Sequence, residues 1–165
     1  MSSWLAVGGG YALHKNDVAG PTDRATALTT SIGVGSSPAG AFALGGIART
    51  VTNFSLGTDI SVSPRIATRG FVRGDWGVAF DAGVVGRFWG SGDYGRFPLQ
   101  AVITGGAPWG IQLGVGADVW NLSGAPYARG GFAVLELDLL RLTVMRQGSS
   151  EAFWPNSSPA GGHFH

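Results

Sequence analysis

The sequence predicts an all-β protein: an up-and-down antiparallel β-barrel of about eight strands that crosses a membrane with those strands. Three observations carry this prediction. Apolar and small or polar residues alternate with period two along much of the chain, turn residues recur at short intervals, and charged residues make up only 13% of the 165 residues. Soluble domains average roughly 25% charged residues, so a large water-facing surface is not expected.

Four segments show the alternation most clearly. In the segment from Asn53 to Ile66, Phe54, Ile60 and Val62 alternate with small or charged residues, and no period of 3.6 fits. The other three are the segments around residues 5–13, 75–88 and 109–119. Each of these segments is expected to form a strand with one apolar face and one face of small residues.

Weaker alternation completes the set of eight strands, at residues 24–35, 39–50, 97–105 and 127–138. Residues rich in Gly, Pro, Asn, Asp and Ser separate most neighbouring strands, at 16–22, 36–38, 68–74, 90–96, 105–108 and 121–126. Such short connections favour a meander in which each strand pairs with the next one along the chain.

The alternation predicts one barrel domain over residues 1–146, followed by a C-terminal tail over residues 147–165. The phase breaks at Leu139-Leu140, where either the last strand continues through a β-bulge or a ninth element begins, and we favour the bulge. From Gln147 onward Gly, Ser, Pro and Asn dominate, which is typical of a tail.

The residues opposite the apolar face indicate which face lies inside the barrel. They are mostly Gly, Ala and Ser with a few Asp and Arg, and Lys15 is the only lysine in the chain against ten arginines. Small side chains suit a narrow lumen, whereas a soluble exterior normally carries many Lys and Glu residues. We therefore expect the apolar face to point outward into lipid.

Aromatic residues near the expected strand ends predict two girdles at the membrane surfaces. The girdle residues are expected to be Trp4, Trp76, Trp89, Trp109, Trp120 and Tyr127. A strand from Trp76 to Phe88, tilted by about 40°, covers roughly 25 to 30 Å of height, which matches a hydrocarbon layer.

Charges on the inward face predict ion pairs within the lumen. Asp59 and Arg65 are six residues apart on one strand, and Asp81 and Arg87 are six apart on its antiparallel neighbour. If paired residue numbers sum to 146, Asp59 faces Arg87 and Arg65 faces Asp81. The polar residues expected to extend this network are Asp118, Glu136, Gln100 and Gln112.

Several classes of function have little support in the sequence. The arginines are scattered, which argues against a nucleic-acid partner, and the absence of cysteine excludes thiolate metal sites and thiol catalysis. The motif at 90–95 spells G-x-G-x-x-G but lies between strands, so we expect a loop, and His14 near Asp17 is expected to be a loop histidine. No catalytic residue, metal ligand or cofactor is predicted, and the uncharged stretches are too rich in Gly and Pro for membrane-spanning helices.

In its alternating segments, aromatic strand ends and internal Asp and Arg residues, the chain resembles the small eight-stranded outer-membrane barrels of the OmpA/OmpX type. The resemblance covers about residues 4–146 and implies a bacterial outer membrane, with membrane lipid as the partner. We expect a non-enzymatic barrel with a plugged polar lumen that serves as an anchor, a structural element or a support for surface loops.

Two other functions remain open on the sequence alone. One is a narrow channel or transporter for small solutes. The other is a β subunit of a larger assembly, in which neighbouring subunits cover the apolar exterior.

Overall fold

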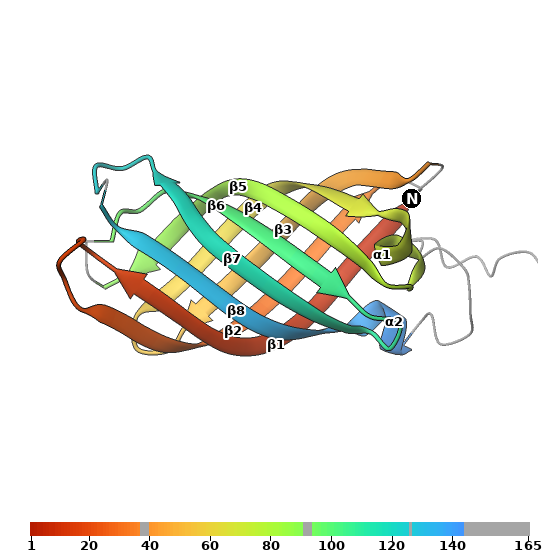
Figure 1. Ribbon diagram of the computed structural model, residues 1–165, viewed down its shortest axis with the longest axis horizontal. Helices are drawn as coiled ribbons and strands as arrows, with labels where there is room; N and C mark the ends of the chain where they lie inside the picture. The colour runs from red at the N-terminus through yellow and green to blue at the C-terminus, as the bar shows by residue number, and fades with distance from the viewer. Residues whose placement is uncertain (37–39, 91–93, 126, 144–165) are drawn as a thin grey trace, which may run out of the picture.

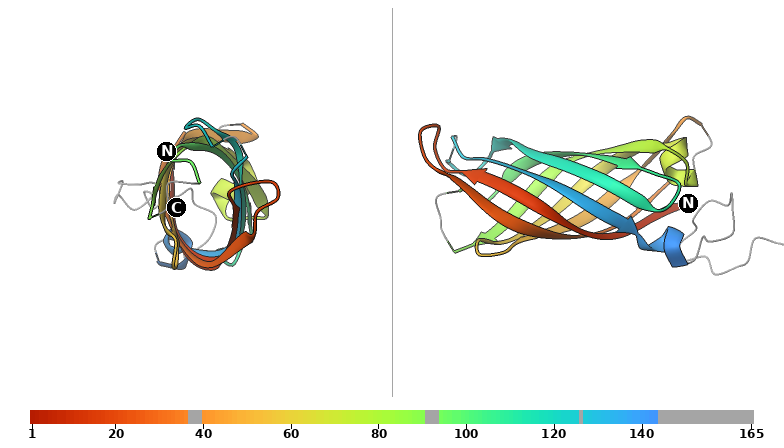
Figure 2. Two further views of the ribbon diagram at one scale, coloured as in Figure 1. Left: turned by 90° about the vertical axis from the view of Figure 1, so that its left-hand side faces the viewer. Right: turned by 60° about the horizontal axis from the view of Figure 1, so that its bottom comes forward.

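The computed structural model describes residues 1–36, 40–90, 94–125 and 127–143. In these residues eight antiparallel strands form one closed barrel, in the order β1-β2-β3-β4-β5-β6-β7-β8. Each strand pairs with its neighbours in the chain, and β1 closes the sheet by pairing with β8. The fold is thus the all-β up-and-down antiparallel barrel that the alternation predicts, and its strands form a closed ring when viewed end-on (Figure 2).

The strands are long and tilted across the barrel (Figure 1). Their bounds are β1 Ser2–Lys15, β2 Thr22–Gly35, β3 Phe42–Asn53, β4 Gly57–Thr68, β5 Gly77–Trp89, β6 Pro98–Gly106, β7 Ile111–Asn121 and β8 Arg129–Asp138. We call the end with the β1–β2, β3–β4, β5–β6 and β7–β8 connections the loop end. The opposite end, which holds the N-terminus and both short helices, is the terminus end.

Alternation along each strand separates an apolar exterior from a polar interior. On β4, for example, Ile60 and Val62 are exposed while Asp59 and Ser61 are buried. The exposed side chains include Leu44, Ile66, Phe80, Val84, Ile103, Leu113, Val115 and Leu135. The buried ones include Arg49, Arg65, Asp81, Arg87, Gln100, Gln112, Asp118 and Glu136.

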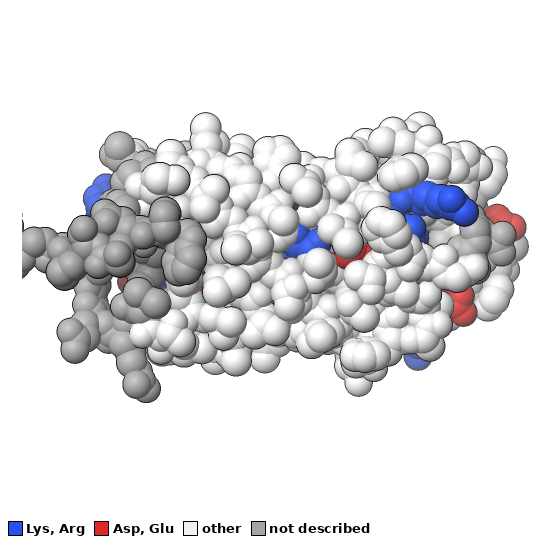
Figure 3. Space-filling model, turned by 180° about the vertical axis from the view of Figure 1, so that it is seen from behind, with Lys and Arg blue, Asp and Glu red and all other residues white. Residues whose placement is uncertain are grey.

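Charge is almost excluded from the outer wall. Among the described strand residues, the charged side chains at outward positions are Lys15, Arg24 and Arg129, and all three lie near the loop end. The face seen in Figure 3 is mostly uncharged, with most coloured atoms toward the loop end, one small central patch and a few at the opposite end.

Two five-residue helices lie at the terminus end. Helix α1, Arg69–Arg73, connects β4 to β5; the Thr68 side chain caps its first turn, and Gly74 ends it in the left-handed conformation. Helix α2, Leu139–Thr143, follows β8 directly. Neither of these helices in the described part of the chain is long or apolar enough to span a membrane.

Helix α2 corrects the expectation of a β-bulge at Leu139-Leu140. The chain leaves the sheet after Asp138, whose carboxylate accepts hydrogen bonds from the backbone N–H groups of Leu140 and Arg141. These bonds satisfy N–H groups in the first turn of a helix, so the phase break marks a helix start. The predicted tail, 147–165, lies outside the described residues.

Candidate functional site

The interior of the barrel holds two clusters of buried charged residues, one toward each end. In the loop-side cluster, the Arg87 guanidinium lies between two carboxylates. Its Nη2 is 2.9 Å from Asp59 Oδ2 and 3.0 Å from Asp118 Oδ2. Gln100 Nε2 donates to the other Asp118 oxygen at 3.1 Å. The ring of Trp89 stacks on the same guanidinium, with 4.2 Å between Arg87 Cζ and the ring centroid.

The terminus-side cluster contains two arginines and two carboxylates. Arg65 makes a two-point contact with Asp81, with Nε to Oδ1 at 2.5 Å and Nη2 to Oδ2 at 2.8 Å. Arg49 Nη1 lies 3.4 Å from Asp81 Oδ2, and its Nε lies 3.9 Å from Glu136 Oε1. The two positive and two negative charges balance, which reduces the cost of burying them.

The pairing register of neighbouring strands explains why the charged side chains of the two clusters meet. β4 and β5 pair Asp59 with Arg87 and Arg65 with Asp81, so the structure brings together both pairs expected from the sum of 146. On β1, Gly8 lies beside Glu136, and a Cβ at Gly8 would lie 2.6 Å from the Glu136 Cα. The glycine therefore leaves room for Glu136, which accepts a hydrogen bond from Thr29 Oγ1 at 2.9 Å.

A layer of apolar side chains lies between the two charged clusters. Ala12, Ala27, Val51, Val102, Phe132 and Val134 form one buried hydrophobic group inside the barrel. On β3 the order of inward residues is Arg49, Val51 and Asn53, and on β8 it is Phe132, Val134 and Glu136. Five strands contribute to this apolar group, whereas on β4 the buried residues between Asp59 and Arg65 are Ser61 and Ser63.

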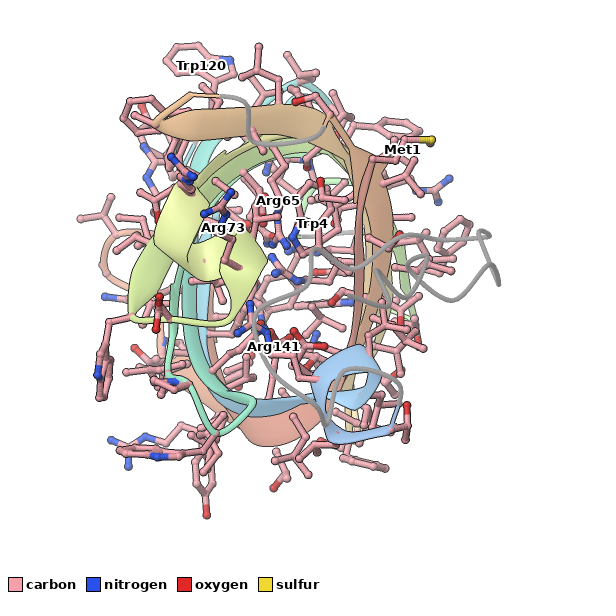
Figure 4. The ribbon with its side chains drawn as sticks, turned by 90° about the vertical axis from the view of Figure 1, so that its right-hand side faces the viewer. Met1, Trp4, Arg65, Arg73, Trp120 and Arg141 are labelled. Atoms are coloured by element: carbon pink, nitrogen blue, oxygen red, sulfur yellow. The ribbon has the colours of Figure 1, made fainter. Side chains whose placement is uncertain are left out.

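The terminus end is covered from within by aromatic side chains and by the two helices. Figure 4 shows Trp4, Arg65 and Arg141 directed toward the barrel axis at this end. Phe71 of α1 is buried against Trp4 and the wall, and Arg65 Cζ lies 5.2 Å from the Trp4 ring centroid. Arg141 of α2 pairs with Asp138 at 3.0 Å and donates to the backbone carbonyl of Phe71, which ties the two helices together. Gln112 donates to the same Asp138 carboxylate at 3.1 Å.

Four of the six expected girdle residues point outward. Trp76, Trp109, Trp120 and Tyr127 are between 62% and 68% exposed. The rings of Trp76 and Trp109 contact each other edge to face at 5.4 Å between centroids, near the terminus end.

The assignment of Trp4 and Trp89 to the girdles is wrong. Trp4 is 5% exposed and shares its strand phase with buried Ala6 and Ala12. Trp89 shares the inward phase of Arg87, on which it stacks. Both residues lie close to a strand end but keep the inward phase of their strands, whereas Trp120 leaves the inward phase of Asp118 where the β6–β7 register shifts.

His14 is another correction, because it is not a loop histidine. β1 continues through Lys15, and His14 points inward with 4% of its surface exposed. Its ring contacts Trp89 edge to face, 4.5 Å between centroids. Tyr94, from the β5–β6 connection, is also buried at this mouth, where its hydroxyl donates to Asp23.

Arg49, Asp138 and Arg141 are the ionic residues that the sequence reasoning missed. Inward positions of β3 include apolar Ile47 and Val51, so neither face of that segment is distinctly polar and Arg49 has no clear side. A last strand that continued past Leu139-Leu140 would hold Arg141 in an extended segment, away from the carbonyl of Phe71 that it contacts from helix α2. The three-residue spacing from Asp138 to Arg141 was the available signal for a helical contact.

Within the described residues, no group of three or more His, Cys, Asp or Glu side chains is arranged to hold a metal ion. Part of the G-x-G-x-x-G motif, residues 91–93, and the end of the 121–126 turn, residue 126, lie outside the described residues.

No protein-family model matches the chain, and no curated protein matches it. Among solved structures, the chain is similar to a crystal structure of Neisserial surface protein A, with 11% sequence identity and a TM-score of 0.45. That match covers 82% of this chain and 96% of the other.

Proposed function

We propose that this protein is a bacterial outer-membrane barrel without enzymatic activity, which anchors itself in the bilayer and supports its loops at the cell surface. The distribution of side chains is the observation that carries the proposal. Large apolar side chains cover the outside of a closed sheet, while buried ion pairs occupy its interior. This is the reverse of a soluble barrel, whose apolar face fills the core.

The dimensions of the wall support the same proposal. β5 has 13 residues and β7 has 11. At about 3.3 Å per residue and a tilt of about 40°, such strands rise roughly 28 to 33 Å, enough to cross an apolar band about 25 Å tall. In the described residues, closure of the sheet gives every strand a hydrogen-bonded neighbour on each side, so backbone groups along the middle of the wall are paired where they would face lipid.

The interior supports a sealed barrel over a conduit. A hydrated ion crossing the lumen would have to pass two clusters of paired charges and the apolar layer of Val51, Val102 and Phe132 between them. Water is unstable in such a narrow apolar constriction, so the passage of a hydrated ion is unfavourable. We therefore propose that the plugged lumen stabilises the barrel and does not transport solutes.

Membrane insertion can be tested by extraction and gel mobility. The protein, expressed with an export signal, should appear in the outer-membrane fraction, require detergent for extraction and migrate differently in unheated and boiled samples. Recovery as a soluble oligomer without detergent would contradict the membrane proposal and favour the alternative of a subunit in a larger assembly.

Transport is tested separately by planar-bilayer recording. Folding of the reconstituted protein is first verified by its heat-modifiable band, the gel band that migrates differently in unheated and boiled samples. The folded protein should then produce no stepwise conductance. Reproducible channels of one size would contradict the sealed lumen while leaving membrane insertion intact.

A further inference from the structure

The outer wall carries threonine hydroxyls on one side only. Among the described strand residues, the Ser and Thr side chains that are not buried all lie on β2, β3 or β4. They are Thr22, Thr26, Thr30, Thr50, Thr52, Thr58 and Thr68. β3 and β4 lie at the back of the barrel in Figure 1, so the hydroxyls are concentrated on that side.

Thr30 and Thr50 lie within the apolar wall. They face each other on β2 and β3, and their neighbours in the same outward row are Val7 of β1 and Ile60 of β4. Their hydroxyl oxygens are 2.6 Å apart and share one hydrogen bond. In a membrane barrel this pair is surrounded by hydrocarbon, as Ile60 is.

The shared bond leaves one of the two O–H groups without an acceptor. Each hydroxyl has a single hydrogen to donate, so when one donates to the other, the second O–H is unused. Within the described residues, the side chains of Thr30 and Thr50 make no other hydrogen bond. An unpaired O–H in hydrocarbon is unfavourable, and acyl chains offer it no acceptor. A hydroxyl of another protein wall would satisfy it.

The wall beside this pair is shallow, which allows a second wall to approach closely. Toward the terminus end, the outward residues of β3 that follow Thr50 are Ala48 and Gly46. A Cβ added at Gly46 would meet nothing closer than a backbone oxygen at 3.9 Å. Ile32 of β2 and Val62 of β4 flank Ala48 and are 57% and 69% exposed. Small residues of this kind let membrane-spanning helices pack closely, and the same steric argument applies to two barrel walls.

We propose that this face of β2, β3 and β4 binds a second copy of the chain. The inference rests on the proposed function, since the hydroxyl pair lies in hydrocarbon only in a membrane barrel. A two-fold axis along the membrane normal keeps both copies in the same orientation and brings the same residues together at the same depth. The unused O–H of each copy then donates to a threonine oxygen of the other.

The charge distribution is compatible with such a dimer. No charged side chain points outward on β3 or β4 among the described residues. Two copies of this face therefore meet without repulsion between like charges.

Cysteine cross-linking in outer-membrane vesicles tests the contact, because the chain contains no native cysteine. A48C places a thiol on the proposed face, and A133C places one at an outward alanine of β8 as the matched control. Oxidation with copper phenanthroline should convert most of A48C to a disulfide-linked dimer and leave A133C monomeric. Equal dimer yields would indicate random collisions and overturn the proposal, and so would the absence of dimer from both variants.

Sedimentation equilibrium in detergent micelles tests the role of the hydroxyls. T30V/T50V removes both hydroxyls at nearly constant side-chain size and should raise the dimer dissociation constant about sevenfold, or roughly 1.2 kcal/mol for two hydrogen bonds between membrane-spanning surfaces. Y11F removes an exposed hydroxyl on β1 and should match the wild type. A wild type that remains monomeric, or a T30V/T50V variant that dimerises as strongly as Y11F, would overturn the proposal.

Each sample is also run unheated and boiled on a gel. A wild type with a heat-modifiable band but no dimer rejects the dimer alone, whereas a wild type without that band rejects the membrane barrel itself.

Discussion

Arg87 shows how single side chains hold the interior together. Its guanidinium contacts Asp59 and Asp118 and lies against the Trp89 ring, all within the buried loop-side cluster. Desolvation makes each isolated charge costly, so the contribution of Arg87 depends on its partners being present.

Replacing Arg87 by Met should destabilise the folded barrel by about 3–5 kcal/mol, because two buried carboxylates lose their cation. The free energy of unfolding is measured by urea titration of the protein in detergent micelles, with the heat-modifiable band as the readout. R96M is the matched control, since Arg96 is exposed. A change in R87M as small as that in R96M would contradict the importance of the cluster.

Some contacts between single side chains can be predicted from the sequence, and others cannot. Equal six-residue spacings on antiparallel neighbours bring Asp59 to Arg87 and Arg65 to Asp81 when the paired residue numbers sum to 146, which is the register that β4 and β5 adopt. Nearness to a strand end is a misleading signal at Trp4 and Trp89, because both keep the inward phase of their strands. Contacts across the lumen, such as Arg49 with Glu136, depend on closure of the whole barrel and leave no local pattern.

At the scale of elements, the two short helices close the terminus end of the barrel. Phe71 of α1 is 1% exposed and packs with Trp4, Val72 and the surrounding alanines. Arg141 of α2 reaches the carbonyl of Phe71 and so joins the helices across the opening.

Replacing Phe71 by Ala should therefore cost about 3–5 kcal/mol of folding free energy, the usual loss for a buried aromatic side chain. F42A is the control, because Phe42 lies outward near the same end and is 60% exposed. Urea unfolding in the same micelles compares the two. Equal losses in F71A and F42A would show that α1 contributes nothing beyond contact with detergent or lipid.

Eight strands could be predicted from the sequence because each repeats the alternation over many residues, whereas the helices could not. Five residues make less than two turns, too few for a period of 3.6 to appear. The signals at α1 were confined to its ends, where Thr68 caps the first turn and Gly74 takes φ of 92°. At α2, the break at Leu139-Leu140 is compatible with a bulge as well as with a helix.

At the scale of the whole molecule, the interior consists of an apolar layer between two ionic clusters. Val51, Val102 and Phe132 belong to that layer and come from β3, β6 and β8. Because these three strands are spaced around the closed sheet, their side chains narrow the lumen from different sides.

The triple variant V51S/V102S/F132S should hydrate this layer and let small ions cross. We expect stepwise conductance in planar bilayers, in contrast to a silent wild type. An outward triple variant, V62S/V115S/F80S, makes the same chemical changes on exposed positions and should remain silent. A folded inward variant that never conducts would show that the seal lies in the charged clusters or in the helices.

The sidedness of the wall supports every proposal above, and spin labelling measures it directly. The chain contains no cysteine, so single labels can be placed at residues 60, 61, 62 and 63 of β4 without removing any other thiol. In reconstituted vesicles, collisions with oxygen should be frequent at Ile60 and Val62 and rare at Ser61 and Ser63, with little access of a water-soluble nickel reagent to the first two. An apolar wall facing lipid would be contradicted by two results together. The labels at Ile60 and Val62 would collide freely with the nickel reagent, and they would collide with oxygen no more often than the labels at Ser61 and Ser63.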